Sequence, residues 1–101
     1  MVSKVTEELD NQDAIQLIRE IVEFGTVVLS GHAKERMAER GYTMHDVEHI
    51  LLRGEIARKE FNPEANNWKY TIKGEALEGE GGGVVTAIIR RDALILITVL
   101  G

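Results

Sequence analysis

The sequence predicts an α+β domain in which N-terminal helices pack on a small antiparallel sheet of about four strands. Two observations predict this class. Apolar residues recur at helical spacing in the first half of the chain, and beyond Gly54 apolar and polar residues alternate as they do in strands. The chain has 101 residues, the length of one domain, which we expect to span residues 1–101.

The composition is that of an ordinary globular protein, with 44% hydrophobic and 29% charged residues. The chain has no cysteine, so it can form neither a disulfide nor a thiolate metal site. The first residues do not form a basic segment leading into an apolar run, and no apolar stretch reaches the length of a membrane span. We therefore expect a cytoplasmic protein with no membrane partner.

A first helix is predicted over residues 10–25, capped by Asp10 or Asn11 and ended by Gly25. Its apolar residues share one side at helical spacing. They are Ala14, Ile15, Leu17, Ile18, Ile21, Val22 and Phe24. This helix should therefore lie on an apolar surface with its acidic side in water.

Two further helices are predicted before the strands. Residues 26–30 form a brief strand or an extended lead-in, after which Ser30 caps the second helix and Gly41 ends it. Thr43 begins a third helix with the spacing of a capping box, and this helix runs to Gly54. Because the connection is short, the second and third helices are expected to form a tight helical hairpin.

The second half predicts two pairs of strands. Residues 55–61 and 68–73 form a hairpin with Trp68, Tyr70 and Ile72 inward. The glycine-rich residues 74–83 are expected to be a flexible connection. The closing pair is predicted at residues 84–91 and 93–100. Because the last strand is apolar on both sides, it should lie inside the sheet or be covered by the first helix or a partner subunit.

The net charge of −5 argues against a nucleic-acid-binding protein, because phosphate contacts require clustered Lys and Arg. Most of the excess is confined to one segment. Residues 1–31 hold two basic and six acidic residues, a net charge of −4, and the remaining residues are nearly neutral. The net charge is therefore a weaker argument against a nucleic-acid-binding surface that lies outside residues 1–31.

His32, Arg36 and Arg40 form the most informative pattern in the sequence, because residues spaced at i, i+4 and i+8 line one side of a helix. Two guanidiniums offer forked donors to phosphate oxygens, and an imidazole can exchange a proton near neutral pH. The alternative is a solvated helix side on which Glu35 and Glu39 pair with the arginines.

Residues 45–49 match the short H-x-x-E-H pattern of one group of zinc peptidases. His45, Glu48 and His49 share a side of the third helix, but that side lies opposite the apolar one and should face solvent. A catalytic zinc also needs a third protein ligand and a walled cleft. We therefore expect no metal and no cofactor.

Basic side chains also occur on the predicted strands. Lys69, Thr71 and Lys73 alternate away from the inward residues, and further positive charge lies at Arg58, Lys59, Arg90 and Arg91. These groups either converge on one surface or protect sheet edges from aggregation. The choice depends on strand register, which the sequence does not fix.

The stretch "SGHAKERMAERGYTMHDVEHILLRGEI" resembles the signature S-x-H-A-x-x-R-M-x-E-R-G of a family of small prokaryotic domains of unknown function. The ending "VVTAIIRRDALILITVL" resembles the closing hairpin of the same family. The resemblance covers residues 27–100, so the helix at residues 10–25 is an addition to it. That family in turn resembles toxins of the RelE, BrnT and MqsR type, whose helices pack on a small antiparallel sheet and which cleave messenger RNA.

This resemblance implies a RelE-like architecture and a metal-independent endoribonuclease, the toxin of a toxin–antitoxin pair. His32 would then shuttle protons and Arg36 and Arg40 would hold the scissile phosphate. The charge clamp would be completed by Lys69, Tyr70 or Arg90. Implied partners are an antitoxin protein and RNA or the ribosome. The alternative, which the acidic balance favours, is a non-enzymatic protein-interaction domain whose charged stripe binds an acidic protein segment or stabilises a homodimer.

Overall fold

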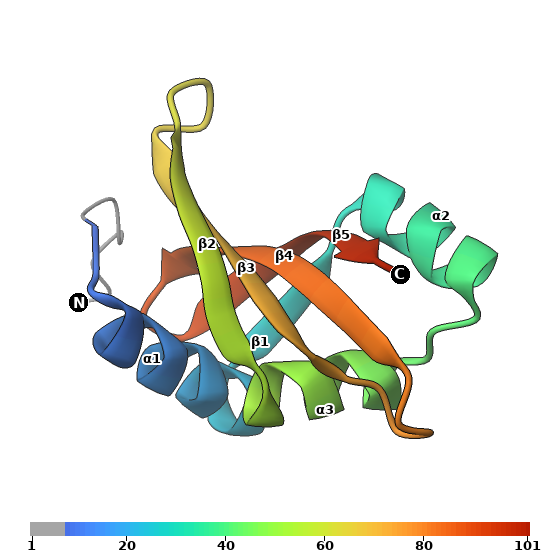
Figure 1. Ribbon diagram of the computed structural model, residues 1–101. Coiled ribbons are helices and arrows are strands. Elements are labelled where there is room, and N and C mark those ends of the chain that lie inside the picture. The colour runs from blue at the N-terminus through green and yellow to red at the C-terminus, as the bar shows by residue number, and fades with distance from the viewer. Residues whose placement is uncertain (1–7) are drawn as a thin grey trace.

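The computed structural model describes residues 8–101, so the first seven residues of the predicted domain lie outside the described residues. Three helices and five strands follow one another along the chain (Figure 1), and the α+β class is confirmed. The elements are α1 (Asn11–Phe24), β1 (Thr26–Leu29), α2 (Gly31–Arg40), α3 (Met44–Arg53), β2 (Glu55–Asn62), β3 (Asn67–Glu75), β4 (Gly81–Arg90) and β5 (Ala93–Leu100). None of the helices in this described part is long and apolar enough to cross a membrane.

The five strands form one mixed sheet in the order β1-β5-β4-β3-β2. The four strands from β2 to β5 are antiparallel, as predicted. The expectation of about four strands was too low, because β1 adds a fifth that runs parallel to β5, with Thr26 opposite Ala93. β5 therefore has a strand on each side, which confirms its predicted place inside the sheet.

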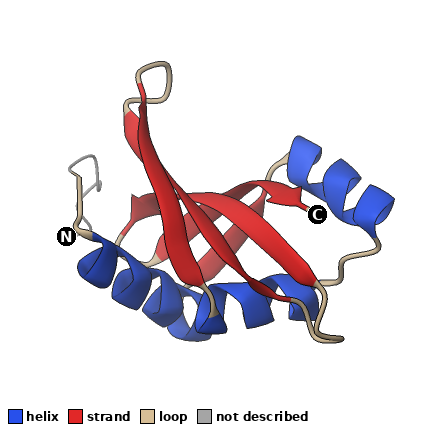
Figure 2. Ribbon diagram, in the orientation of Figure 1, coloured by secondary structure: helices blue, strands red, loops and turns tan. Residues whose placement is uncertain are grey.

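Two helices, α1 and α3, lie side by side along one face of the sheet (Figure 2). The side chains that meet there are fully or almost fully buried, since apolar burial is the main driving force for packing helices on a sheet. On the helices they are Ala14, Ile18, Ile21, Val47, Ile50 and Leu51, and on the strands Tyr70, Ile72, Val84, Ile88, Leu94, Leu96 and Val99. The inward direction predicted for Tyr70 and Ile72 is confirmed.

The other face of the sheet, which we call the open face, is covered by neither α1 nor α3. On β3 it carries Lys69, Thr71 and Lys73, because side chains of a strand alternate between the two faces. The residues opposite them on β4 are Ala87, Val85 and Gly83. The open face is therefore basic along β3 and formed by small or apolar residues along β4.

The helix ends follow the capping signals in the sequence. Asp10 accepts a hydrogen bond from the backbone of Asp13, and Ser30 accepts one from Ala33. Thr43 starts α3 with a complete capping box. Gly41 ends α2 with a φ of 70°, a backbone conformation that favours glycine. The predicted end of the first helix is right, but its last residue, Phe24, is 86% exposed and does not join the core.

The predicted hairpin of the second and third helices is wrong. α2 packs against β5, whereas α3 packs against β3, β4 and α1 (Figure 1). At the start of α2 the Ser30 hydroxyl donates to the carbonyl of Ile97 at 3.1 Å, and just past its end the Tyr42 hydroxyl donates to the carbonyl of Leu100 at 3.2 Å. These two bonds hold α2 alongside the part of β5 that β1 does not cover, so α2 cannot turn back onto α3.

Gly54 is required where α3 meets β3, and this gives the first prediction. A Cβ atom at Gly54 would lie 2.6 Å from the carbonyl oxygens of Ile50 and Lys73. We expect Gly54→Ala to lower the free energy of unfolding by about 2 kcal/mol, the usual cost of overpacking. Gly31→Ala is the matched control, because no atom lies within 4 Å of a Cβ there. Urea unfolding followed by circular dichroism measures both, and equal stabilities would contradict this account.

Asp46 gives the second prediction. The backbone N–H groups of Thr43 and Leu77 donate to its carboxylate and hold the pKa of Asp46 below its ordinary value of 3.8. Since the folded state lowers this pKa, the bonds stabilise the fold above about pH 3.8 and lose their effect as the pH falls further. We expect Asp46→Asn to reduce the loss of stability between pH 4 and pH 2, measured as the shift of the urea midpoint. If the urea midpoint of Asp46→Asn falls between pH 4 and pH 2 by as much as that of the wild-type protein, this role of Asp46 is contradicted.

Candidate functional site

Three of the predicted site residues lie on successive turns of α2. We call His32, Arg36 and Arg40 the α2 row. The helix buries Ala33 and Met37 against the core, and this orientation leaves the row accessible. His32 and Arg40 are exposed, and the side chain of Arg36 retains 30% of its exposure. The row extends about 12 Å along the helix axis.

The contacts of the row are weak or involve only backbone. A guanidinium nitrogen of Arg36 lies 3.5 Å from the carboxylate of Glu39, which is an exposed pair of small energetic value. The guanidinium of Arg40 lies against Gly101, at the end of β5. Between residues 8 and 101, His32 and Arg40 form no ion pair with a carboxylate side chain. The pairing with Glu39 that the alternative interpretation expected is therefore present for Arg36 alone.

Two other predicted site residues, Lys69 and Arg90, lie apart from the row. The ammonium group of Lys69 is 3.5 Å from the Glu60 carboxylate, and Nε of Arg90 is 2.8 Å from Asp92. Arg40, at the end of the row, lies against Gly101, and the preceding residue, Leu100, pairs with Gly83 near the start of β4. Arg90 lies at the other end of β4, roughly 20 Å away along the strand. Each of these cations is thus next to an acidic group, and they do not converge with the row.

Tyr70 lies on the opposite face of the sheet from Lys69. It is 1% exposed among the core side chains, and its hydroxyl accepts a hydrogen bond from the backbone of Leu9 at 3.3 Å. Burial raises the pKa of Tyr70 above its ordinary value of 10.0. The structure therefore gives Tyr70 a role in packing and does not bring it to the row.

The H-x-x-E-H residues do not form a ligand set. Nδ1 of His45 is 3.7 Å from the carboxylate of Glu48, whereas Nδ1 of His49 donates to the carbonyl of Glu75 at 2.7 Å. Over residues 8–101, no group of three or more His, Asp or Glu side chains is arranged to hold a metal ion. The two histidines therefore have separate partners.

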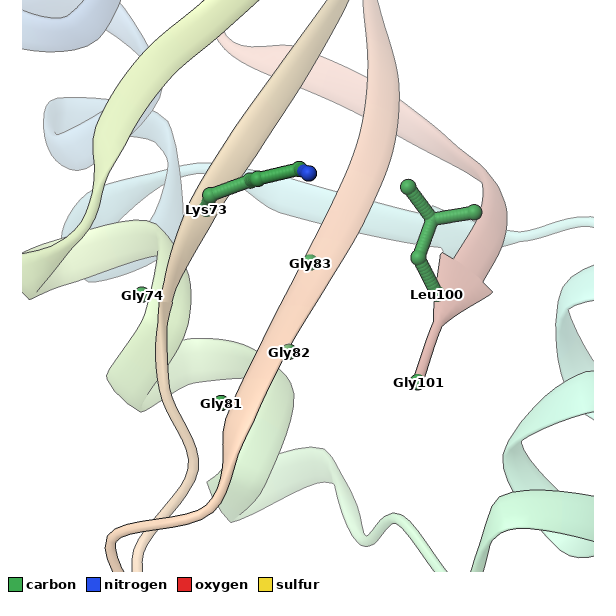
Figure 3. A pocket seen from close by; sticks show the side chains of 7 residues that line it. All are labelled: Lys73, Gly74, Gly81, Gly82, Gly83, Leu100 and Gly101. Carbon is green, nitrogen blue, oxygen red and sulfur yellow. The ribbon is translucent and has the colours of Figure 1, made fainter.

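A pocket that the sequence interpretation missed lies on the open face (Figure 3). Its volume is about 350 Å³. We call it the Lys73 pocket, and it is lined by Lys73, Gly74, Gly81, Gly82, Gly83, Leu100 and Gly101. The side chain of Lys73 extends from β3 toward β4, and Leu100 lies on the far side of β4 (Figure 3).

The pocket corrects the expectation of a flexible connection at residues 74–83. Gly74 belongs to β3 and residues 81–83 belong to β4, so only residues 76–80 connect the two strands. The outward alternation of Lys73 was visible in the sequence. Its position opposite Gly83, which itself lies opposite Leu100, depends on register, and no sequence signal specified that register.

The comparisons with known proteins identify a family. A family model described as a domain of unknown function, DUF4258, matches residues 29–100. Searches of curated proteins and of solved structures gave no significant match. The matched residues include the α2 row, α3 and the strands β2 to β5, and they exclude α1. Since the match covers well over half of the chain, this protein belongs to the DUF4258 family.

Proposed function

We propose that this domain is a metal-independent endoribonuclease, the toxin of a toxin–antitoxin pair, and that the α2 row holds the scissile phosphate. The observation that carries the proposal is the accessibility of one imidazole and two guanidiniums on one helix. Within residues 8–101, the Arg36–Glu39 contact is the only ion pair that these three side chains form. Arg side chains bind phosphate oxygens through two parallel donors. A weak exposed pair such as Arg36–Glu39 can exchange for a phosphate at little cost.

The first turn of α2 also favours an anion near His32. The backbone N–H groups of Gly31 and His32 have no partner within the helix, because only the N–H of Ala33 is capped by Ser30. Such N–H groups, together with the helix dipole, attract phosphate. A phosphate held there would lie beside the imidazole of His32.

The distribution of charge agrees with this surface. The acidic helix α1 and the basic row on α2 lie at opposite ends of the molecule (Figure 1). Repulsion between α1 and an RNA chain is weakened by distance and by salt, since exposed charges are screened within about 10 Å. The net charge of −5 therefore does not describe the charge near the row.

The proposed reaction is an internal transfer within RNA. The ribose 2′-oxygen attacks the adjacent phosphorus, the bond to the 5′-oxygen breaks, and the products are a 2′,3′-cyclic phosphate and a 5′-hydroxyl. His32 would accept the proton of the 2′-hydroxyl or return one to the leaving oxygen. Arg36 and Arg40 would stabilise the additional negative charge of the phosphorane. The proposed reaction does not use the other three predicted site residues. Lys69 and Arg90 each lie beside an acidic group, and Tyr70 is buried.

A second candidate function, a non-enzymatic protein-interaction domain, is favoured by a separate observation. Phe24 is 86% exposed, and Val28, on the edge strand β1, is 41% exposed. An exposed aromatic side chain beside a free strand edge is typical of a surface that binds another chain. This surface is distinct from the α2 row, so an antitoxin partner or a second copy could use it in either function.

The third prediction tests Arg36. We expect expression of the chain to arrest growth, and the purified protein to cleave RNA to 5′-hydroxyl ends in the presence of EDTA. Arg36→Ala should reduce the rate about a hundredfold, because one lost charge-assisted donor to the phosphorane costs about 3 kcal/mol. Lys34→Ala is the matched control, since Lys34 is an exposed cation on the other side of the same helix. The measurement is single-turnover cleavage of end-labelled RNA.

Expression that leaves growth unchanged would contradict this proposal if the folded protein also cleaves RNA neither alone nor on ribosomes. That result would support the interaction domain. Equal losses in Arg36→Ala and Lys34→Ala would contradict the specific role of the row. Unfolding midpoints of both variants, measured in parallel, separate loss of activity from loss of structure.

The fourth prediction concerns proton transfer by His32. We expect His32→Ala to lower the cleavage rate and to flatten its pH dependence near neutrality, the range in which imidazole exchanges protons. His45→Ala serves as the control, because that imidazole is exposed on α3 and not on the α2 row. The measurement is the rate profile from pH 5 to pH 9. A profile of unchanged shape in His32→Ala would assign proton transfer to another group.

A further inference from the structure

The Lys73 pocket has an unusual floor, because the strand beneath it carries no side chains on the open face. A Cβ atom at Gly81 or Gly83 would lie on this face. A Cβ atom on the intervening Gly82 would lie on the other face and collide with the Tyr42 hydroxyl. Gly81 is exposed and Gly82 is half-buried, whereas Gly83 is buried next to Leu100, so the accessible backbone of the floor is that of Gly81 and Gly82. A flat group can lie directly on this floor.

The pocket also has an available cation. Lys73 is exposed, and its ammonium group forms no ion pair in the described part of the chain, although Glu55 is its neighbour in register on β2. Figure 3 shows this side chain lying across the pocket and not turned toward β2. At the other end, the guanidinium of Arg40 lies against Gly101, which forms part of the lining. Lys73 favours an anionic ligand in this pocket, whereas Arg40 itself lines the neighbouring pocket together with Asp46, Glu78 and Glu80.

The pocket lies next to the α2 row. α2 runs beside β5 from Ile97, where Ser30 is bonded, toward Leu100, where Tyr42 is bonded. The row thus begins at His32 and ends at Arg40, against a residue of the pocket. An extended ligand that follows the row toward Arg40 therefore reaches the Lys73 pocket next.

We propose that the Lys73 pocket binds one nucleotide of single-stranded RNA, with its phosphate on Lys73 and its base between the glycine floor and Leu100. The volume of about 350 Å³ is at the small end of ligand pockets and matches a unit of this size. Because the floor presents no side chains, the contact is one of shape and stacking, which every base can make. This inference rests on the proposed function for the identity of the ligand and assigns the pocket to binding, not to chemistry.

The experiment, our fifth prediction, uses a short fluorescein-labelled 2′-O-methyl oligouridine, which cannot be cleaved, and fluorescence anisotropy at several salt concentrations. We expect Lys73→Glu to raise Kd about tenfold and to lower the slope of log Kd against log salt by about one, because one phosphate contact is lost. Arg91→Glu makes the same charge change at an exposed position in the turn between β4 and β5, roughly 25 Å along the strand from Gly83, and should leave Kd within about twofold because of screening.

A second variant tests the shape of the pocket. No atom lies within 4 Å of a Cβ at Gly81, so Gly81→Val is accommodated by the fold while it obstructs the floor. It should raise Kd about tenfold and leave the salt slope unchanged, because stacking is lost and no charge is altered.

The outcomes separate the two proposals. Wild-type protein that fails to bind the oligouridine, or Lys73→Glu and Gly81→Val variants that bind as tightly as wild type, would overturn the pocket proposal. If such protein still cleaves RNA, the proposed function stands without the pocket. Binding that depends on Lys73 and Gly81, in a protein that cleaves no RNA, would support the pocket and overturn the endoribonuclease.

Discussion

The outer edge of β5 determines where the candidate site lies. β5 lies inside the sheet, but its neighbour β1 is only four residues long and covers half of its outer edge. The carbonyls of Ile97 and Leu100 are satisfied by the hydroxyls of Ser30 and Tyr42, at the two ends of α2. A free strand edge invites pairing with another chain, and a helix laid over it prevents this. The basic row is therefore held beside the end of the sheet by the requirement to cover β5.

The features that depend on local chemistry could be predicted from the sequence. Asp10, Ser30 and Thr43 start the three helices as their side chains indicate, and Gly41 ends α2 as expected. The inward positions of Tyr70 and Ile72 follow from alternation alone. What could not be predicted depends on pairing across long sequence distances. The parallel pairing of β1 with β5 is one case, since four β-branched or apolar residues carry no information about their partner.

The candidate site shows the same division. The spacing of His32, Arg36 and Arg40 was sufficient to place them along one helix. Whether Lys69 and Arg90 lie near this row depended on strand register and on the carboxylates of Glu60 and Asp92. No sequence pattern paired these carboxylates with the two cations. The run of glycines was expected to be a loop because glycine weakens strands. In the structure, β4 includes Gly81, Gly82 and Gly83, since Gly82 leaves room for the Tyr42 hydroxyl and Gly83 lies next to Leu100.

The bond between Ser30 and Ile97 joins residues that are 67 positions apart, and this has a consequence for the order in which the protein assembles. Contacts so distant in sequence form late, because a long loop must close before they contribute energy. During synthesis the helices emerge first, yet α2 has no strand to lie against until β5 has been made. The surface beside α2 and the wall formed by Leu100 are thus completed in the same late step, so the nascent chain lacks the candidate site while most of its secondary structure can already form.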